Sequence, residues 1–361
     1  MIYDNTTLTA VDLFAGAGGF SCAALSAGIN IRAAVEYNNH ACFTYNENIS
    51  KNHPELSFYE ANILNLPPEQ LVNESYADGK SCDILLGGPP CQGFSVHRIK
   101  DAGVDDPRNQ LILRYFKFVE SLRPKVFLME NVPGMLWKRH EKYLADFYKE
   151  GHEVGYDIRQ PVVIDARDYG VPQRRKRVFV LGVRKDVDLN IEWPPSPTHC
   201  SPKQLKTDSS LKPWRTASEV FEAPVSLGDP NNIHMNHTKK MIDRLTEVPL
   251  NGGSRKDTSW VLPCHVEHNG HKDVYGRIDP SQPGPTMTTA CVNPSKGRFV
   301  HPTEHHGIAV RHAARFQTFP DDFIFYGGLM AAGAQVGNAV PVRLGAALLS
   351  EIKKGLLERI R

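Results

Sequence analysis

The sequence predicts an α/β fold, with a doubly wound, mostly parallel sheet and a second, smaller lobe rich in loops. In the first half, short apolar runs alternate with segments of helical spacing. Several of these runs end at a glycine, a proline or a carboxylate. From about Trp193 to Arg311 the periodic pattern gives way to many prolines and glycines.

The expected strands span residues 8–14, 30–36, 56–60, 82–86, 125–130 and 177–182. The expected helices span 21–27, 111–121 and 342–360. Ligands of such sheets bind beyond the carboxyl ends of the strands. We therefore expect the turns after the first, second, fourth and fifth strands to line the site.

The composition is that of an ordinary soluble protein, with 41% hydrophobic and 23% charged residues in 361. No apolar stretch approaches the roughly 18 residues of a membrane span, and no signal-peptide pattern begins the chain. We expect a cytoplasmic monomer without a membrane partner. Seven scattered cysteines without a CxxC pair favour reduced thiols. The net charge of +2 neither indicates nor excludes a nucleic-acid partner.

A glycine-rich turn, DLFAGAGGF, follows the first strand. Its glycines allow backbone N–H groups to approach a ligand. Their spacing does not match the dinucleotide fingerprint, and no Lys-Ser/Thr pair indicates a phosphate loop. Glu36, at the end of the second strand, is placed to bind ribose hydroxyls. A nucleoside derivative is the predicted ligand; a plain turn with a surface glutamate is the alternative.

Cys91 lies in GGPPCQGFS, directly after the fourth strand. A free cysteine is more often a small buried residue, but this polar context at the ligand edge favours a reactive thiol. Glu130 ends the fifth strand, and alternation places Arg175 and Arg177 of QRRKR on one face of the next. Together they offer a nucleophile, a proton carrier and cations for an oxyanion. Taken singly, each also fits a solvated strand end.

These motifs occur in the order DLFAGAGGF, Glu36, GGPPCQGFS, MENV, Q-x-R-x-R and QVGNAVP. In this the chain resembles the DNA (cytosine-5) methyltransferases of bacterial style, over most of its length except about 190–270. The resemblance implies the Rossmann-like fold of methyltransferases that use S-adenosylmethionine. It places a catalytic, cofactor-binding domain at 1–189 plus 324–361, and a target-recognition lobe with the hinge segment at 190–323.

The resemblance also implies the reaction, which is methyl transfer from S-adenosylmethionine to C5 of a cytosine flipped out of duplex DNA. Cys91 would attack C6 and form a covalent adduct. Glu130 would hold or protonate N3, and Arg177, supported by Arg175, would stabilise charge near O2. The chain would be a DNA cytosine-5 methyltransferase, either with a cognate restriction endonuclease or as an orphan.

Site residues carry over from the family position by position. Those expected around the cofactor are Phe14, Gly16, Gly18, Gly19, Phe20, Glu36, Tyr37, Asn62, Ile63, Pro90, Asn338 and Ala339. Asn62 stands where the family often has aspartate. Residues 92–108 would close over DNA, with Gln92, Ser95 and Arg108 as contacts.

The recognition lobe would enter the major groove. Its candidate base or phosphate contacts are Arg215, Lys239, Lys240, Arg255, Lys256 and Lys272, none of which the sequence singles out. The family usually has Arg-Glu where this chain has Arg311-His312, which puts one structural ion pair in doubt. Zinc is conceivable at Cys264, His265, His268 and His271, but we expect no metal.

Three other functions fit parts of the pattern. A tRNA cytosine-5 methyltransferase could use the same scaffold, although the large variable lobe favours DNA. A non-catalytic nucleoside- or DNA-binding module would not need Cys91, Glu130 and Arg177 together. A nicotinamide dehydrogenase fits the sheet but not the glycine spacing.

Overall fold

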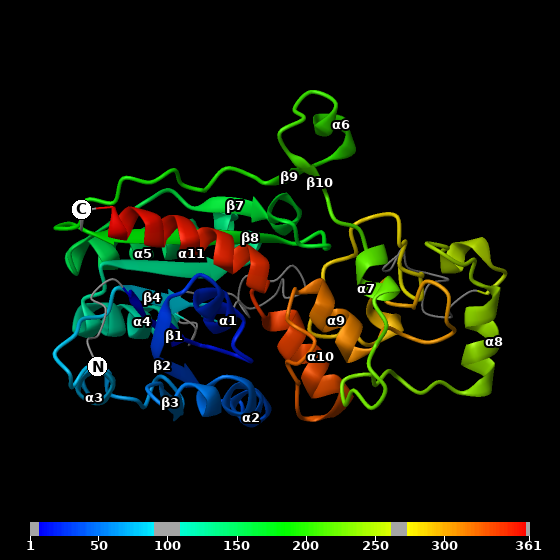
Figure 1. The fold of residues 1–361 in the computed structure, drawn as a ribbon, viewed down its shortest axis with the longest axis horizontal. Helices are drawn as coiled ribbons and strands as arrows, with labels where there is room; N and C mark the ends of the chain where they lie inside the picture. The colour runs from blue at the N-terminus through cyan, green and yellow to red at the C-terminus, as the bar shows by residue number, and fades with distance from the viewer. Residues whose placement is uncertain (1–6, 90–108, 261–272, 359–361) are drawn as a thin grey trace. The chain divides into compact units, whose positions relative to one another are not determined.

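Figure 1 shows the computed structural model, which describes residues 7–89, 109–260 and 273–358. The chain divides into two compact units. Unit 1 contains Met1–Asp165, Lys176–Ser196 and Leu344–Arg361, and unit 2 contains Ala166–Arg175 and Pro197–Arg343. The boundaries of these compact units differ from those of the functional domains expected from the sequence. The functional domains therefore remain a prediction.

Unit 1 is built on one eight-stranded sheet in the order β3-β2-β1-β4-β5-β8-β6, with β7 also paired to β8. Its strands are β1 (Thr9–Leu13), β2 (Asn30–Glu36), β3 (Ser57–Glu60), β4 (Ile84–Gly87), β5 (Val126–Asn131), β6 (Tyr156–Ile158), β7 (Val162–Asp165) and β8 (Lys176–Arg184). The first five strands pair in parallel, and β8 runs antiparallel to β5, β6 and β7. The predicted mostly parallel α/β fold is confirmed.

Successive side chains of a strand point to opposite faces of the sheet, and the central strands are apolar on both faces. Helices therefore cover both faces and bury these side chains. Unit 1 contains α1 (Gly19–Ser26), α2 (Asn39–Asn48), α3 (Pro68–Ser75), α4 (Asn109–Leu122), α5 (Glu141–Glu153) and most of α11 (Val342–Leu357). On one face, Val11, Leu85 and Phe127 share a buried cluster with Leu71 of α3 and Phe147 of α5. The α1 helix packs on β1 and β2.

Unit 2 is rich in loops, as the change of composition predicts (Figure 1). Its regular elements are β9 (His199–Cys200), β10 (Lys212–Pro213), α6 (Pro202–Leu205), α7 (Ser218–Glu222), α8 (Lys239–Glu247), α9 (Val310–Phe316) and α10 (Gly328–Asn338). Buried loop carbonyls need donors, and buried arginines supply them here. Arg277, fully buried, donates to the carbonyl oxygens of Val248, Leu245 and His301.

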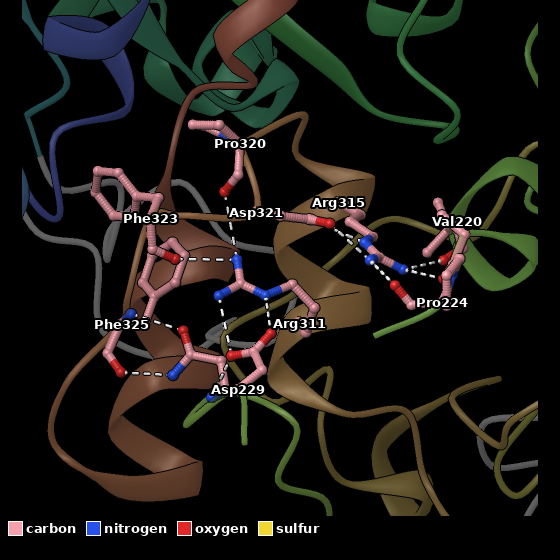
Figure 2. A network of polar contacts seen from close by, with 11 residues as sticks. Val220, Pro224, Asp229, Arg311, Arg315, Pro320, Asp321, Phe323 and Phe325 are labelled. Carbon is pink, nitrogen blue, oxygen red and sulfur yellow. Dashed lines mark hydrogen bonds and ion pairs between the residues drawn. The ribbon is translucent and has the colours of Figure 1, made fainter. Parts of the chain in front are cut away.

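Two arginines of α9 fasten the loops of unit 2 (Figure 2). Arg311 is fully buried and forms an ion pair with Asp229, 2.6 Å from Nε to Oδ2. Arg315 pairs with the more exposed Asp321 at 2.7 Å and donates to the carbonyl oxygens of Val220 and Pro224. Arg311 therefore keeps an acidic partner, drawn from 82 residues earlier in the chain.

Candidate functional site

The glycine-rich turn that follows β1 has positive φ angles, which few residues with a side chain adopt. Phe14 has φ 58°, and Gly16 and Gly18 have φ 57° and 99°. A positive φ is costly for any residue with a Cβ, and such strain is concentrated at functional sites. Gly19 then begins α1, whose Phe20 is buried and meets Phe179 edge-on at 6.5 Å between ring centroids.

Glu36 joins the ends of β1 and β2. Its Oε2 accepts from the backbone N–H of Gly16 at 2.9 Å, and its Oε1 accepts from Tyr37 and Asn38 at 2.9 and 2.8 Å. Tyr37 is 64% exposed, which leaves its ring face open to a flat ligand. A carboxylate oxygen accepts more than one hydrogen bond, so the fixed Glu36 carboxylate fits ribose hydroxyls.

A further turn, after β3, is joined to the end of β2, because the Ala61 N–H donates to the backbone carbonyl oxygen of Glu36 at 2.8 Å. Asn62 is exposed, and its Oδ1 accepts from Leu64 N–H at 3.0 Å. Ile63 is buried, and its carbonyl accepts from Arg114 Nε at 2.8 Å. The three turns that follow β1, β2 and β3 thus form one hydrogen-bonded edge. A Cβ built on Gly16 would meet nothing within 4 Å, so the turn borders open space there, which fits the nucleoside part of S-adenosylmethionine.

Glu130 and Arg177 form an ion pair of 2.8 Å between Oε1 and Nε. Their side chains are 11% and 14% exposed. In the antiparallel β5–β8 register Glu130 is opposite Phe179, so Arg177 is its diagonal neighbour on the same face. A carboxyl beside a fixed cation can hold a proton at one atom of a base and stabilise negative charge at another.

The end of β5 also contacts the described residues that precede the predicted nucleophile in the chain. Asn131 Nδ2 donates to the Pro89 carbonyl at 3.3 Å, and a Cβ built on Gly88 would lie 3.7 Å from Glu130 Oε2. Gly88 is thus next to the Glu130 carboxylate and three positions before Cys91. Asn131 was not predicted as a site residue, although its place in the MENV motif was an available signal.

Several predicted residues lie outside the described part of the chain: Pro90, Cys91, Gln92, Ser95, Arg108, Cys264, His265, His268, His271 and Lys272. Among the candidate DNA contacts of unit 2, Arg215 pairs with Glu219, Arg255 is buried, and Lys239, Lys240 and Lys256 are exposed.

The other predicted site residues belong to unit 2. Arg175 is 1% exposed and donates to backbone carbonyl oxygens, including those of Gly337 and Ala339. Asn338, between those two residues, is exposed. The predicted alternation is confirmed in the exposure of QRRKR, since Arg174 and Lys176 are exposed where Arg175 is buried and Arg177 is half-buried.

Two general properties concern metal ions and membranes. Among residues 7–89, 109–260 and 273–358, no group of three or more His, Cys, Asp or Glu side chains could hold a metal ion. Within the same residues, every helix is too short or too polar to cross a membrane.

Comparison with known proteins agrees with the motifs. Residues 8–354 match the family described as C-5 cytosine-specific DNA methylase. The Type II methyltransferase M1.HphI of Haemophilus parahaemolyticus is 32% identical over 96% of this chain and 87% of its own length. The Type II methyltransferase M.DdeI of Desulfomicrobium norvegicum is 33% identical over 95% of this chain and 88% of its own.

Solved structures agree on the fold. A candidate DNA modification methyltransferase of E. coli, encoded within a prophage, has a TM-score of 0.74 at 24% identity and covers 97% of this chain and 99% of its own. DNMT2 of Spodoptera frugiperda has a TM-score of 0.63 at 17% identity, over 96% of this chain and 99% of its own. With the family match over residues 8–354 and relatives above 30% identity, this chain belongs to the C-5 cytosine-specific DNA methylase family.

Proposed function

We propose that this protein methylates C5 of one cytosine within a specific duplex DNA sequence, as the modification enzyme of a type II restriction–modification system. The Glu130–Arg177 pair, next to the segment that carries Cys91, is the observation that supports it best. The names of the relatives support the DNA substrate and the type II system. A cognate endonuclease and a monomeric state belong to the same proposal.

Family members use S-adenosylmethionine, which supplies an electrophilic methyl group when bound. The turns after β1, β2 and β3 would hold its nucleoside part, with Glu36 on the ribose and Tyr37 beside the adenine. The full proposed set is Phe14, Gly16, Gly18, Gly19, Phe20, Glu36, Tyr37, Asn62, Ile63, Pro90, Asn338 and Ala339.

The remaining chemistry belongs to side chains of this protein and the flipped base. The Cys91 thiolate would bond to C6, which turns the unreactive C5 into an enamine-like nucleophile. Glu130 would hold the proton at N3, and Arg177 would stabilise the charge that develops at O2. C5 would take up the methyl group, and S-adenosylhomocysteine would be the other product. Loss of the C5 proton to a base and departure of the thiolate would then restore the aromatic ring.

Bisulfite sequencing of plasmid DNA from cells that express the chain tests the proposal and reveals the target sequence. Cys91→Ser should abolish methylation and retain binding of S-adenosylmethionine, because the serine hydroxyl is a poor nucleophile at neutral pH. Cys22→Ser, which alters a half-exposed cysteine of α1, is the matched control and should methylate normally. Full activity of Cys91→Ser would contradict the mechanism, and methylation of tRNA in place of duplex DNA would contradict the substrate.

A further inference from the structure

Three polar side chains of unit 2 are buried together although none belongs to a regular strand. Gln173 and Gln317 are 0% exposed and Arg175 is 1% exposed. They come from QRRKR and from the RFQTFP stretch, two motifs separated by more than 130 residues. Buried polar groups are costly unless they are paired, so their partners indicate what they do.

Their hydrogen bonds close into a ring. Gln173 Nε2 donates to Gln317 Oε1 at 2.9 Å, and Gln317 Nε2 donates to the Ala339 carbonyl at 3.0 Å. Arg175 Nη2 donates to that same carbonyl at 2.9 Å, while its Nη1 donates to the Met287 carbonyl at 2.8 Å. Met287 N–H donates back to Gln173 Oε1 at 2.7 Å.

The ring holds the carboxyl end of α10. The last carbonyls of a helix have no partner within it and carry partial negative charge. Here Gln317 also donates to Val336 at 2.7 Å, and Arg175 donates to Gly337 at 2.9 Å. Gly337 itself lies so close to the 288–289 backbone that an added Cβ would be 2.2 Å from the Thr288 carbonyl carbon.

Asn338 lies between the two residues whose carbonyl oxygens Arg175 holds, and its side chain is not part of the ring. Asn338 is exposed, while the carbonyls of Gly337 and Ala339 on either side are held by Arg175. We propose that Arg175 is a positioning residue for the cofactor: it fixes the backbone on either side of Asn338, so that Asn338 and Ala339 are presented in the conformation that binds S-adenosylmethionine. This rests on the proposed function, and it differs from the supporting role at cytosine O2 that the Q-x-R-x-R pattern suggests.

The two roles predict opposite kinetics for the two arginines of that pattern. Lysine keeps the charge but loses the fork that reaches Met287, Gly337 and Ala339 together. Arg175→Lys should weaken binding of S-adenosylmethionine by about 10-fold and change kcat at saturating cofactor by less than about 3-fold. Arg177→Lys should instead lower kcat by about 100-fold or more and leave cofactor binding unchanged.

Isothermal titration with S-adenosylmethionine, in the absence of DNA, and single-turnover methylation of a duplex carrying the target measure the two quantities. Arg174→Lys is the matched control, because the Arg174 side chain is exposed, and it should bind cofactor like the wild type. If Arg175→Lys lowers kcat while cofactor affinity stays at the wild-type value, or if it changes neither, the positioning role is wrong. Failure of the wild type to bind S-adenosylmethionine would instead contradict the proposed function.

A second variant tests the same clamp if Arg175→Lys does not fold. Gln317→Glu keeps the size of the side chain and replaces the Nε2 donor, which serves Val336 and Ala339, by an acceptor. The loss of cofactor affinity should have the same direction as in Arg175→Lys, with kcat at saturation retained. Unchanged affinity in a folded Gln317→Glu protein would overturn the inference.

Discussion

Asp12 lies in β1, directly before the glycine-rich turn, and only 1% of its surface is exposed. Its Oδ2 accepts from Ser21 Oγ at 2.7 Å, and Ser21 Oγ lies 2.8 Å from the Tyr45 hydroxyl. Burial raises the pKa of Asp12 from 3.8 to about 7, although the Ser21 hydrogen bond opposes the shift. The free energy of unfolding should therefore depend on pH close to neutrality through this residue.

Asp12→Asn should remove that dependence. Because the pKa of Asp12 is higher in the folded than in the unfolded protein, protonation of Asp12 stabilises the folded state. This contribution to the free energy of unfolding is complete below pH 3.8 and is lost as the pH rises to about 7. A shift of about three units corresponds to roughly 4 kcal/mol. Urea unfolding of both proteins between pH 5 and 8 should show the wild type losing stability relative to the variant as the pH rises. A pH-independent difference would contradict the assignment.

For individual residues, the sequence predicted which residues belong to the site better than it predicted their contacts. Glu130 and Arg177 were expected at one edge, but their ion pair depends on the β5–β8 register, which no local pattern contains. Arg175 and Arg177 look equivalent in the sequence, and only the structure shows that Arg175 donates to the carbonyls at the end of α10. Asn131 was missed because an asparagine at a strand end has many uses.

Among the elements, the expected strands at 30–36, 82–86, 125–130 and 177–182 correspond closely to β2, β4, β5 and β8. The antiparallel direction of β8 was not predicted, nor were the short strands β6 and β7 that pair with it. β6 and β7 have only three and four residues, too few to show an alternation, and neither runs directly into a motif as the equally short β4 does. Direction is set by the connections of the whole chain rather than by the strand itself.

Helix α9 shows how a departure from the family pattern is accommodated. His312 stands where the family has glutamate, and its Nδ1 accepts from the Ala309 N–H at 3.4 Å. Arg311 pairs instead with Asp229 from another loop of unit 2, and both side chains are almost fully buried. Asp229 could not be predicted as this partner, because the loop that carries it contains no motif.

Asp229→Asn should be strongly destabilising, by about 3 kcal/mol or more, because it leaves the buried Arg311 guanidinium uncompensated. The control is the partner of the other arginine of α9: Asp321, which pairs with Arg315, is 55% exposed (Figure 2). Asp321→Asn should cost no more than about 1 kcal/mol. Chemical denaturation of the two variants measures the difference. Equal losses would show that burial does not decide the strength of these pairs.

For the whole molecule, the change of composition near Trp193 indicated a second lobe, and the part of the chain assigned to unit 2 begins again at Pro197. The sequence could not show that Ala166–Arg175 also belongs to unit 2. That segment joins unit 2 through hydrogen bonds to residues more than 100 positions away, such as those from Gln173 and Arg175.

The last helix, α11, completes unit 1. Lys353 Nζ donates to the Ala27 and Gly28 carbonyls at 3.0 and 2.9 Å, and a Cβ built on Gly355 would lie 2.2 Å from Ile191 Cγ2. Leu348→Ala, at a fully buried position, should therefore cost about 2–5 kcal/mol in the free energy of unfolding. Lys354→Ala, on the exposed face, should change it by less than about 0.5 kcal/mol. Urea denaturation compares them.

The same arrangement has a consequence for synthesis on the ribosome. The strands of unit 1 lie within the first 184 residues, yet α11, which belongs mostly to the same unit, ends only at Leu357. Until α11 has been translated, the Ala27 and Gly28 carbonyls lack the Lys353 donor, and Ile191 lacks its close neighbour Gly355. A ribosome that stalls within unit 2 should therefore leave a unit 1 that is less stable, and more readily cleaved by proteases, than in the full chain.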